Sequence, residues 1–162
     1  MKISYNWLRR YLQTDIPLSQ IEEILTAIGL EVESVAEVEQ IAGSLTGVVT
    51  GEVLECSKHP GADMLSLTKV DVGSGEPLAI VCGAPNVAKG QKVLVATVGT
   101  LLTSSKGDVL KIKRSKIRGE ESMGMICAED ELGLGDSHEG IMVLPQETPV
   151  GVSAKEYLKL ES

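Results

Sequence analysis

The sequence predicts a mainly β protein with an α/β flank, in which a small β-barrel or β-sandwich is joined to a short helical region. From about residue 41 onward, short β-branched runs recur at roughly ten-residue spacing, separated by clusters of Gly, Pro, Asn or Ser, a pattern typical of small barrels and sandwiches. The first 30 residues instead repeat their apolar positions at helical spacing. With 162 residues, of which 43% are apolar, the chain can bury one substantial core.

Two helices are expected at the start of the chain. Ser4 is placed to cap a short helix that runs to about Tyr11, and Pro17 suits the first turn of a second helix. Gly29 suits a left-handed cap at the end of that helix, and the loosely alternating segment 30–39 is predicted to be a strand leading away from it. The second helix has an apolar face formed by Leu18, Ile21, Ile24, Leu25 and Ile28.

The later part of the chain is predicted to consist of strands, with little helix. The predicted strands are "GVVTGEVLEC", "MLSLTKVDVG", "PLAIVCG", "KVLVATVG", "VLKIKRSKIRG" and "GMIC". The segment "AEDELGLG" predicts one short helical turn, and "SAKEYLKLES" returns to helical character.

These elements predict three parts. Residues 1–40 form a helical or α+β piece, residues 41–150 form the β domain, and residues 151–162 begin a return to the first piece. The final helix has no cap and no following turn, so we expect the chain to be cut from a longer protein.

Composition predicts the cellular location of the protein and the types of side chain in its core. No apolar run reaches the roughly 18 residues that a membrane helix needs, and the N-terminus lacks a signal-peptide pattern, so a cytoplasmic protein is expected. Cys56, Cys82 and Cys127 are odd in number and widely spaced, which favours buried, reduced thiols over a disulfide. The chain has no Phe, and residues 41–150 contain no aromatic residue of any kind, so the core is built from aliphatic side chains.

Two segments of the sequence superficially suggest an enzyme or metal site. Gly135, Ser137 and His138 superficially suggest an esterase, but neighbouring residues in a Gly-rich loop do not hold a base on a nucleophile. Cys56 and His59 have a metal-ligand spacing, yet a second ligand pair is missing. No phosphate-binding glycine loop is present. We therefore expect no catalytic residue, no metal site and no cofactor in this chain.

The most unusual segment is "KIKRSKIRG", residues 111–119, which holds five of the 15 lysines and arginines. Residues 105–120 carry six cations against Asp108 and Glu120, a local charge of +4, although the whole chain carries −8. In a strand, Lys111 and Lys113 share one face and Ile112 the other, and the pleat must change phase near Arg114. The segment is therefore predicted to be a bent, exposed strand.

Two interpretations of this basic strand stay open. Lysines can protect an edge strand from aggregation, or they can follow a nucleic-acid backbone. Because residues 41–150 lack aromatic rings for base stacking, RNA binding would be mostly to phosphate. Five contacts would lower the affinity on the order of a hundredfold between about 50 and 200 mM salt.

Several motifs occur together in the order and spacing of one family. They are "MKISYNWLRRYL", "HPGADMLSLTKVDVG", "IVCGAPNVAKGQKV", "KIKRSKIRGEESMGMICAEDELGL" and "GIMVLP" followed by "TPVG". Over essentially the whole chain they resemble the N-terminal region of bacterial phenylalanine–tRNA ligase β subunits, and the middle portion resembles an OB-type tRNA-binding domain. The resemblance implies a five-stranded Greek-key OB barrel inserted in a small, incomplete helical or α+β domain.

The resemblance also implies partners and site residues. The parent ligase joins phenylalanine to tRNA(Phe) with ATP and magnesium, and its β subunit pairs with a catalytic α subunit in an α2β2 assembly. The family's tRNA-contacting stretch corresponds here to Lys111, Lys113, Arg114, Lys116 and Arg118. The expected function is sequence-nonspecific contact with the tRNA backbone. The alternative is a structural module of the heterotetramer with little RNA contact.

Overall fold

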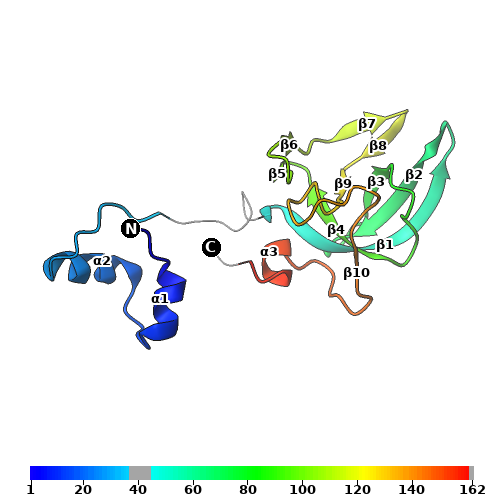
Figure 1. Ribbon diagram of the computed structural model, residues 1–162. Helices are drawn as coiled ribbons and strands as arrows, with labels where there is room; N and C mark the ends of the chain where they lie inside the picture. The colour runs from blue at the N-terminus through cyan, green and yellow to red at the C-terminus, as the bar shows by residue number, and fades with distance from the viewer. Residues whose placement is uncertain (37–44, 161–162) are drawn as a thin grey trace. The chain divides into compact units, whose positions relative to one another are not determined.

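The computed structural model describes residues 1–36 and 45–160. The chain divides into two compact units, unit 1 (Met1–Val38) and unit 2 (Glu39–Ser162). Figure 1 shows helices in the first and the strand-rich part of the chain in the second. Each unit is described separately below.

Unit 1 contains the two predicted helices, α1 (Tyr5–Tyr11) and α2 (Leu18–Ala27). Ser4 caps α1, since its hydroxyl oxygen accepts a hydrogen bond from the backbone N–H of Trp7 at 3.3 Å. Pro17 occupies the N-cap of α2 rather than its first turn. The predicted apolar face of α2 is largely exposed, because neither helix has a fully buried residue.

The predicted strand over residues 30–39 is wrong for the portion that the structure describes. Residues 30–36 have no regular secondary structure, and residues 37–39 lie outside the described part of the chain. Gly29 does adopt the predicted left-handed conformation, with φ +93°. A strand is stable only when its backbone pairs with another strand, and residues 1–36 contain no partner.

The strands of unit 2 include every predicted run and several short strands that the sequence did not indicate. In chain order they are β1 (Val48–His59), β2 (Ala62–Asp71), β3 (Leu78–Cys82), β4 (Lys92–Thr97), β5 (Leu101–Thr103), β6 (Val109–Lys111), β7 (Ser115–Ile117), β8 (Glu120–Ser122), β9 (Gly124–Ile126) and β10 (Val143–Leu144). One short helix, α3 (Ala154–Tyr157), follows them. The predicted helical turn at 128–135 is a set of hydrogen-bonded turns rather than a helix.

Five of these strands form a nearly closed antiparallel barrel. The sheet order is β10-β4-β1-β2-β3, and β9 pairs with residues 95–97 of β4, beyond the two residues that pair with β10. The segment before β9 returns to β3, where the backbone N–H of Met123 donates to the carbonyl of Ala79 at 2.8 Å. The barrel order is thus β1-β2-β3-β9-β4, a five-stranded Greek-key arrangement that confirms the predicted OB fold.

Strand β4 is buried on both faces and separates two hydrophobic clusters. Val93 and Val95 face an inner cluster with residues of β1, β2, β3 and β9. Leu94 and Ala96 face an outer cluster that includes Ile112 and residues from the end of the chain. Since these four side chains of β4 are all fully buried, the central part of the strand is continuously apolar in sequence.

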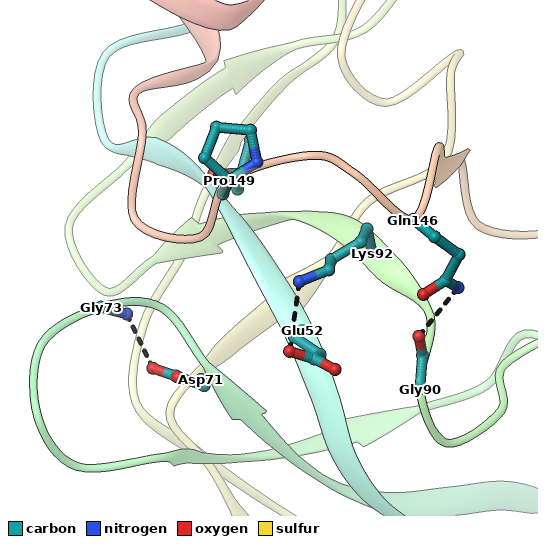
Figure 2. Close-up of polar contacts among 8 residues, drawn as sticks. Glu52, Asp71, Gly73, Gly90, Lys92, Gln146 and Pro149 are labelled. Atoms are coloured by element: carbon teal, nitrogen blue, oxygen red, sulfur yellow. Dashed lines mark hydrogen bonds and ion pairs between the residues drawn. The ribbon is translucent and has the colours of Figure 1, made fainter.

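Polar contacts hold the connections and the last segment against the barrel (Figure 2). The Lys92 ammonium pairs with the Glu52 carboxylate at 3.1 Å, across β4 and β1. Gln146 donates through its side-chain amide to the carbonyl of Gly90 at 2.9 Å. The Thr50 hydroxyl donates to the carbonyl of Pro149 at 2.6 Å, so the chain before α3 runs along β1. Within the described residues, the segment 151–160 belongs to unit 2, and Ala154, Tyr157, Leu158 and Leu160 pack in its outer cluster.

The structure also bears on membrane-spanning helices and on the reactivity of the cysteine thiols. Among the residues that the structure describes, no helix is long and apolar enough to cross a bilayer. Cys56, Cys82 and Cys127 are all free thiols. Burial raises the pKa of Cys127 to about 12, so that thiol is held in its unreactive protonated form.

Candidate nucleic-acid interface

The connection between β4 and β9, residues 98–123, carries the basic segment predicted from the sequence. It folds into two small hairpins, β5–β6 and β7–β8, which Figure 1 shows as separate ribbons beside the barrel. Counted along the chain, β4 and β9 are the fourth and fifth strands of the barrel. Loops that join the fourth and fifth strands of OB barrels are among those that bind oligonucleotides. The basic segment therefore lies where this fold usually binds nucleic acid.

The five predicted contact residues lie in one segment, residues 111–118, and are called the cationic ridge below. Its members are Lys111, Lys113, Arg114, Lys116 and Arg118, and each is exposed. Ile112 points the other way, is 6% exposed and joins the outer cluster. The backbone N–H of Ile112 donates to the Thr100 carbonyl at 2.8 Å, and the Ile112 carbonyl accepts from Gly99 at 2.8 Å. Two backbone hydrogen bonds therefore hold Ile112, and the residues on either side of it, Lys111 and Lys113, are exposed as strand alternation predicts.

The expected single bent strand is instead two strands in different hairpins. Strand β6 ends at Lys111 and β7 begins at Ser115, so the interruption falls where the pleat had to change phase. Arg118 and Gly119 form the two-residue turn of β7–β8, with φ values of +51° and +91°. Positive φ at both positions is the type I′ geometry that suits the twist of a hairpin. Arg118 therefore sits at the hairpin tip.

One cation of the ridge is neutralised within the chain. The guanidinium of Arg114 pairs with the Glu121 carboxylate, to which its Nε donates at 2.6 Å. The remaining four cations, Lys111, Lys113, Lys116 and Arg118, form no ion pair with the described residues. No sequence pattern indicated Glu121 as a partner of Arg114, and in the structure it lies directly opposite Lys116 across the hairpin.

An open cleft of about 570 Å³ lies beside the ridge. Lys111 and Lys113 border it on the ridge side, while Glu131, His138 and Glu139 border it elsewhere. The chain after β3 and apolar residues of the barrel also line it. The ridge and the cleft are therefore adjacent parts of one surface.

The His138 ring is held at this cleft by a carboxylate. Its Nδ1 donates to Asp130, 3.0 Å from Oδ1 and 2.9 Å from Oδ2. This hydrogen bond raises the pKa of His138 above its usual 6.5, and the same bond lowers the pKa of Asp130. From the sequence, only a short helical turn was predicted over 128–135, and no pattern indicated this pairing. In the structure the acidic partner of His138 is Asp130, which gives no support to the esterase arrangement with Ser137.

The Cys56–His59 pair does not build a metal site. His59 is 4% exposed, and its Nδ1 accepts from the backbone N–H of Gly61 at 2.9 Å. Among the described residues, no three His, Cys, Asp or Glu side chains are grouped so that they could hold a metal ion.

The barrel region matches a known protein family. Residues 48–153 match the family model described as "Putative tRNA binding domain". The chain belongs to this tRNA-binding domain family. The matched region covers the barrel, the cationic ridge and the cleft.

The tRNA-binding domain and its flanks are similar to named ligase subunits. The chain is 54% identical over all 162 residues to the phenylalanine–tRNA ligase beta subunit of Bacteroides fragilis. It is 52% identical to that of Salinibacter ruber over 98% of the chain, and 50% identical to that of Dickeya dadantii over 99%. The family resemblance inferred from the motifs is thus confirmed. The chain spans 20%, 19% and 19% of these relatives' lengths, respectively.

Solved structures similar to the tRNA-binding domain include two proteins. The C-terminal domain of Plasmodium vivax p43 matches with a TM-score of 0.45 and 26% identity, over 64% of this chain and 56% of that chain. A MetRS related protein from Pyrococcus horikoshii matches with a TM-score of 0.46 and 23% identity, over 65% of this chain and 85% of that chain.

Proposed function

We propose that the tRNA-binding domain contacts the sugar–phosphate backbone of tRNA through the cationic ridge, in support of phenylalanyl-tRNA synthesis. The observation that carries this proposal is the group of four exposed, unpaired cations on the connection between the fourth and fifth barrel strands. A chain of net charge −8 that concentrates unpaired cations at this position favours a polyanionic partner.

The contact is with phosphate rather than with particular bases. Lys and Arg side chains give backbone contacts that carry no sequence information. With four unpaired cations engaged, affinity falls on the order of fifty- to a hundredfold between about 50 and 200 mM salt. The Arg114–Glu121 pair lowers the contribution of the fifth cation, because the carboxylate competes with phosphate.

The setting of this contact is a ligase larger than the chain itself. The β subunits to which the chain is similar carry the name phenylalanine–tRNA ligase, which supports tRNA(Phe) as the RNA. The whole ligase would use ATP and magnesium, pair the β subunit with a catalytic α subunit in an α2β2 assembly, and work in the cytoplasm. The present chain contributes RNA contact and no catalytic residue, so phenylalanine, ATP and tRNA mixed with it yield no aminoacyl-tRNA.

A structural role in the heterotetramer is the second candidate. Two observations favour it: the overall charge of −8, which repels RNA, and the internal neutralisation of Arg114 by Glu121. Under this alternative the barrel holds neighbouring domains in place, and the ridge contributes little to RNA affinity.

Titration of labelled tRNA(Phe) with the full chain at several salt concentrations separates the two candidates. The triple variant Lys111→Glu, Lys113→Glu, Lys116→Glu replaces three unpaired cations. We expect it to abolish the salt-steep binding of the wild type, because three phosphate contacts become repulsive.

The matched control changes three exposed lysines that are not members of the ridge, Lys2→Glu, Lys89→Glu and Lys155→Glu. It alters net charge by the same amount and should retain most of the affinity. Equal loss in both variants would mean that binding follows net charge rather than the ridge. Absence of wild-type binding even at low salt would favour the structural role.

A further inference from the structure

We propose that the cleft beside the cationic ridge holds one unpaired RNA nucleotide, with its phosphate on Lys111 and Lys113 and its base stacked on the His138 ring. This inference rests on the proposed function, because it assigns a subsite to the same RNA-contacting surface. It goes further by giving the domain a preference for unpaired over fully paired RNA.

The size and lining of the cleft fit this ligand. Its volume of about 570 Å³ lies within the range of roughly 300–1,000 Å³ typical of small-molecule sites. Apolar residues that are at least partly exposed contribute to its lining, among them Leu110, Ile117 and Met125. A base removed from its stack can lie against such a surface, whereas a phosphate cannot.

The charges around the cleft orient the nucleotide. Lys111 and Lys113 are exposed and unpaired within the described residues, so they attract the phosphate. Glu131 and Glu139 line the cleft too, and their charge repels a phosphate from their side. Carboxylates can instead accept hydrogen bonds from the amino groups of a base. The Glu131 carboxylate already accepts from the backbone N–H of Ala128 at 2.8 Å, which leaves Glu139 as the freer acceptor.

His138 supplies the one accessible ring. Residues 41–150 contain no Phe, Tyr or Trp, so the rings of this region are those of His59 and His138. The ring of His59 is 4% exposed and cannot stack on a ligand. The side chain of His138 is 73% exposed and lines the cleft. Unpaired nucleic acid is commonly bound by stacking its bases on such rings.

The ring is also oriented in advance. Asp130 holds Nδ1 at 2.9 Å while its own side chain is 16% exposed, which limits rotation of the imidazole. The groups whose charges act on His138 are Asp130, Glu131 and Lys106, and the first two favour its protonated form. A ring fixed in one orientation loses less conformational freedom when a base stacks on it.

The experiment compares two RNAs with the full chain at low salt. One is a single-stranded oligoribonucleotide, and the other is a blunt RNA duplex with the same number of phosphates. We expect His138→Ala to weaken single-strand binding about fivefold, at the low end of measured base-stacking effects, and to leave duplex binding unchanged. His138→Trp should restore or exceed wild-type single-strand affinity, because the indole provides a larger stacking face.

Other outcomes are equally informative. Ser137→Ala, at the exposed neighbouring position, is the control and should bind both RNAs as the wild type does. If His138→Lys restores affinity and His138→Trp does not, the residue acts by charge and the stacking proposal is overturned. Unchanged single-strand affinity in His138→Ala overturns it as well. Both results leave the proposed function standing if the Lys111, Lys113, Lys116 triple variant still loses duplex binding.

Discussion

At the scale of single residues, the exposure of the ridge lysines was predicted from the sequence, whereas the acidic partners of Arg114 and His138 were not. Lys111 and Lys113 are exposed and Ile112 is buried, as strand alternation requires, so this part of the ridge followed from the sequence. The partners Glu121 and Asp130 did not follow, because each lies seven or eight residues from the side chain it contacts. No short-range pattern links residues at such spacing.

The His138–Asp130 pair gives a prediction about titration. We expect Asp130→Asn to bring the pKa of His138 down toward 6.5, since the hydrogen bond to the carboxylate is the main cause of its elevation. Following the imidazole resonances of His138 by NMR against pH measures this directly. An unchanged His138 titration in Asp130→Asn would rule out the pairing.

The same pair sets the sign of its effect on stability. Because the pKa of His138 is raised in the folded state, its contribution is present below about pH 6.5 and is lost as pH rises through the raised value. Because the pKa of Asp130 is lowered, its contribution is present above about pH 3.8 and is lost as pH falls through the lowered value. The contribution is therefore greatest at mildly acidic pH.

At the scale of elements, the connection 98–123 shows how hairpins organise the site. The basic run was expected to be one bent strand, but β6 pairs with β5 and β7 pairs with β8. Pairing with two different partners breaks the run, and the interruption at 112–114 lets Ile112 enter the outer cluster. The cations are consequently distributed over the two hairpins and the link between them, and all of them are exposed.

Ser122 links the second hairpin to the barrel. Its hydroxyl oxygen accepts from the backbone N–H of Val81 on β3 at 3.1 Å and donates to the Gly124 carbonyl at 3.0 Å, in a site that is 1% exposed. We expect Ser122→Ala to lower the free energy of unfolding by about 1–3 kcal/mol, because the N–H of Val81 loses its partner.

Denaturant unfolding followed by circular dichroism measures this effect. The matched control is Ser115→Ala, at the exposed position directly opposite Ser122 across the hairpin. It should change the unfolding free energy by less than about 0.5 kcal/mol. Equal stabilities for the two variants would contradict the role of Ser122 in linking the second hairpin to the barrel.

At the scale of the whole molecule, unit 2 is held by two aliphatic clusters on opposite faces of β4. Leu94 is fully buried in the outer cluster, with contacts from the connection 98–123 and from the end of the chain. The outer cluster therefore couples the stability of the barrel to the placement of the ridge.

Truncation of Leu94 tests how much the outer cluster stabilises unit 2. Leu94→Ala should lower the free energy of unfolding by about 2–5 kcal/mol, because a cavity is left in a fully buried site. Leu110→Ala, at a side chain that is 49% exposed, is the control and should cost less than about 0.5 kcal/mol. Thermal and denaturant unfolding of both variants provide the comparison, and similar losses would argue against the outer cluster as a stabilising core.

The sequence by itself determined the two N-terminal helices, the main barrel strands and the exposed basic segment. These depend on periodicity, caps and alternation, which act between residues close together in the chain. Only the tertiary structure decided how the barrel closes, which cation is neutralised, and that His138 lies at the same cleft as Lys111. Barrel closure and the cleft join residues far apart along the chain, and the Arg114–Glu121 pair forms across a hairpin whose pairing the sequence did not indicate. The strand predicted over 30–39 is absent from residues 30–36 because strand pairing depends on a partner that local pattern cannot supply.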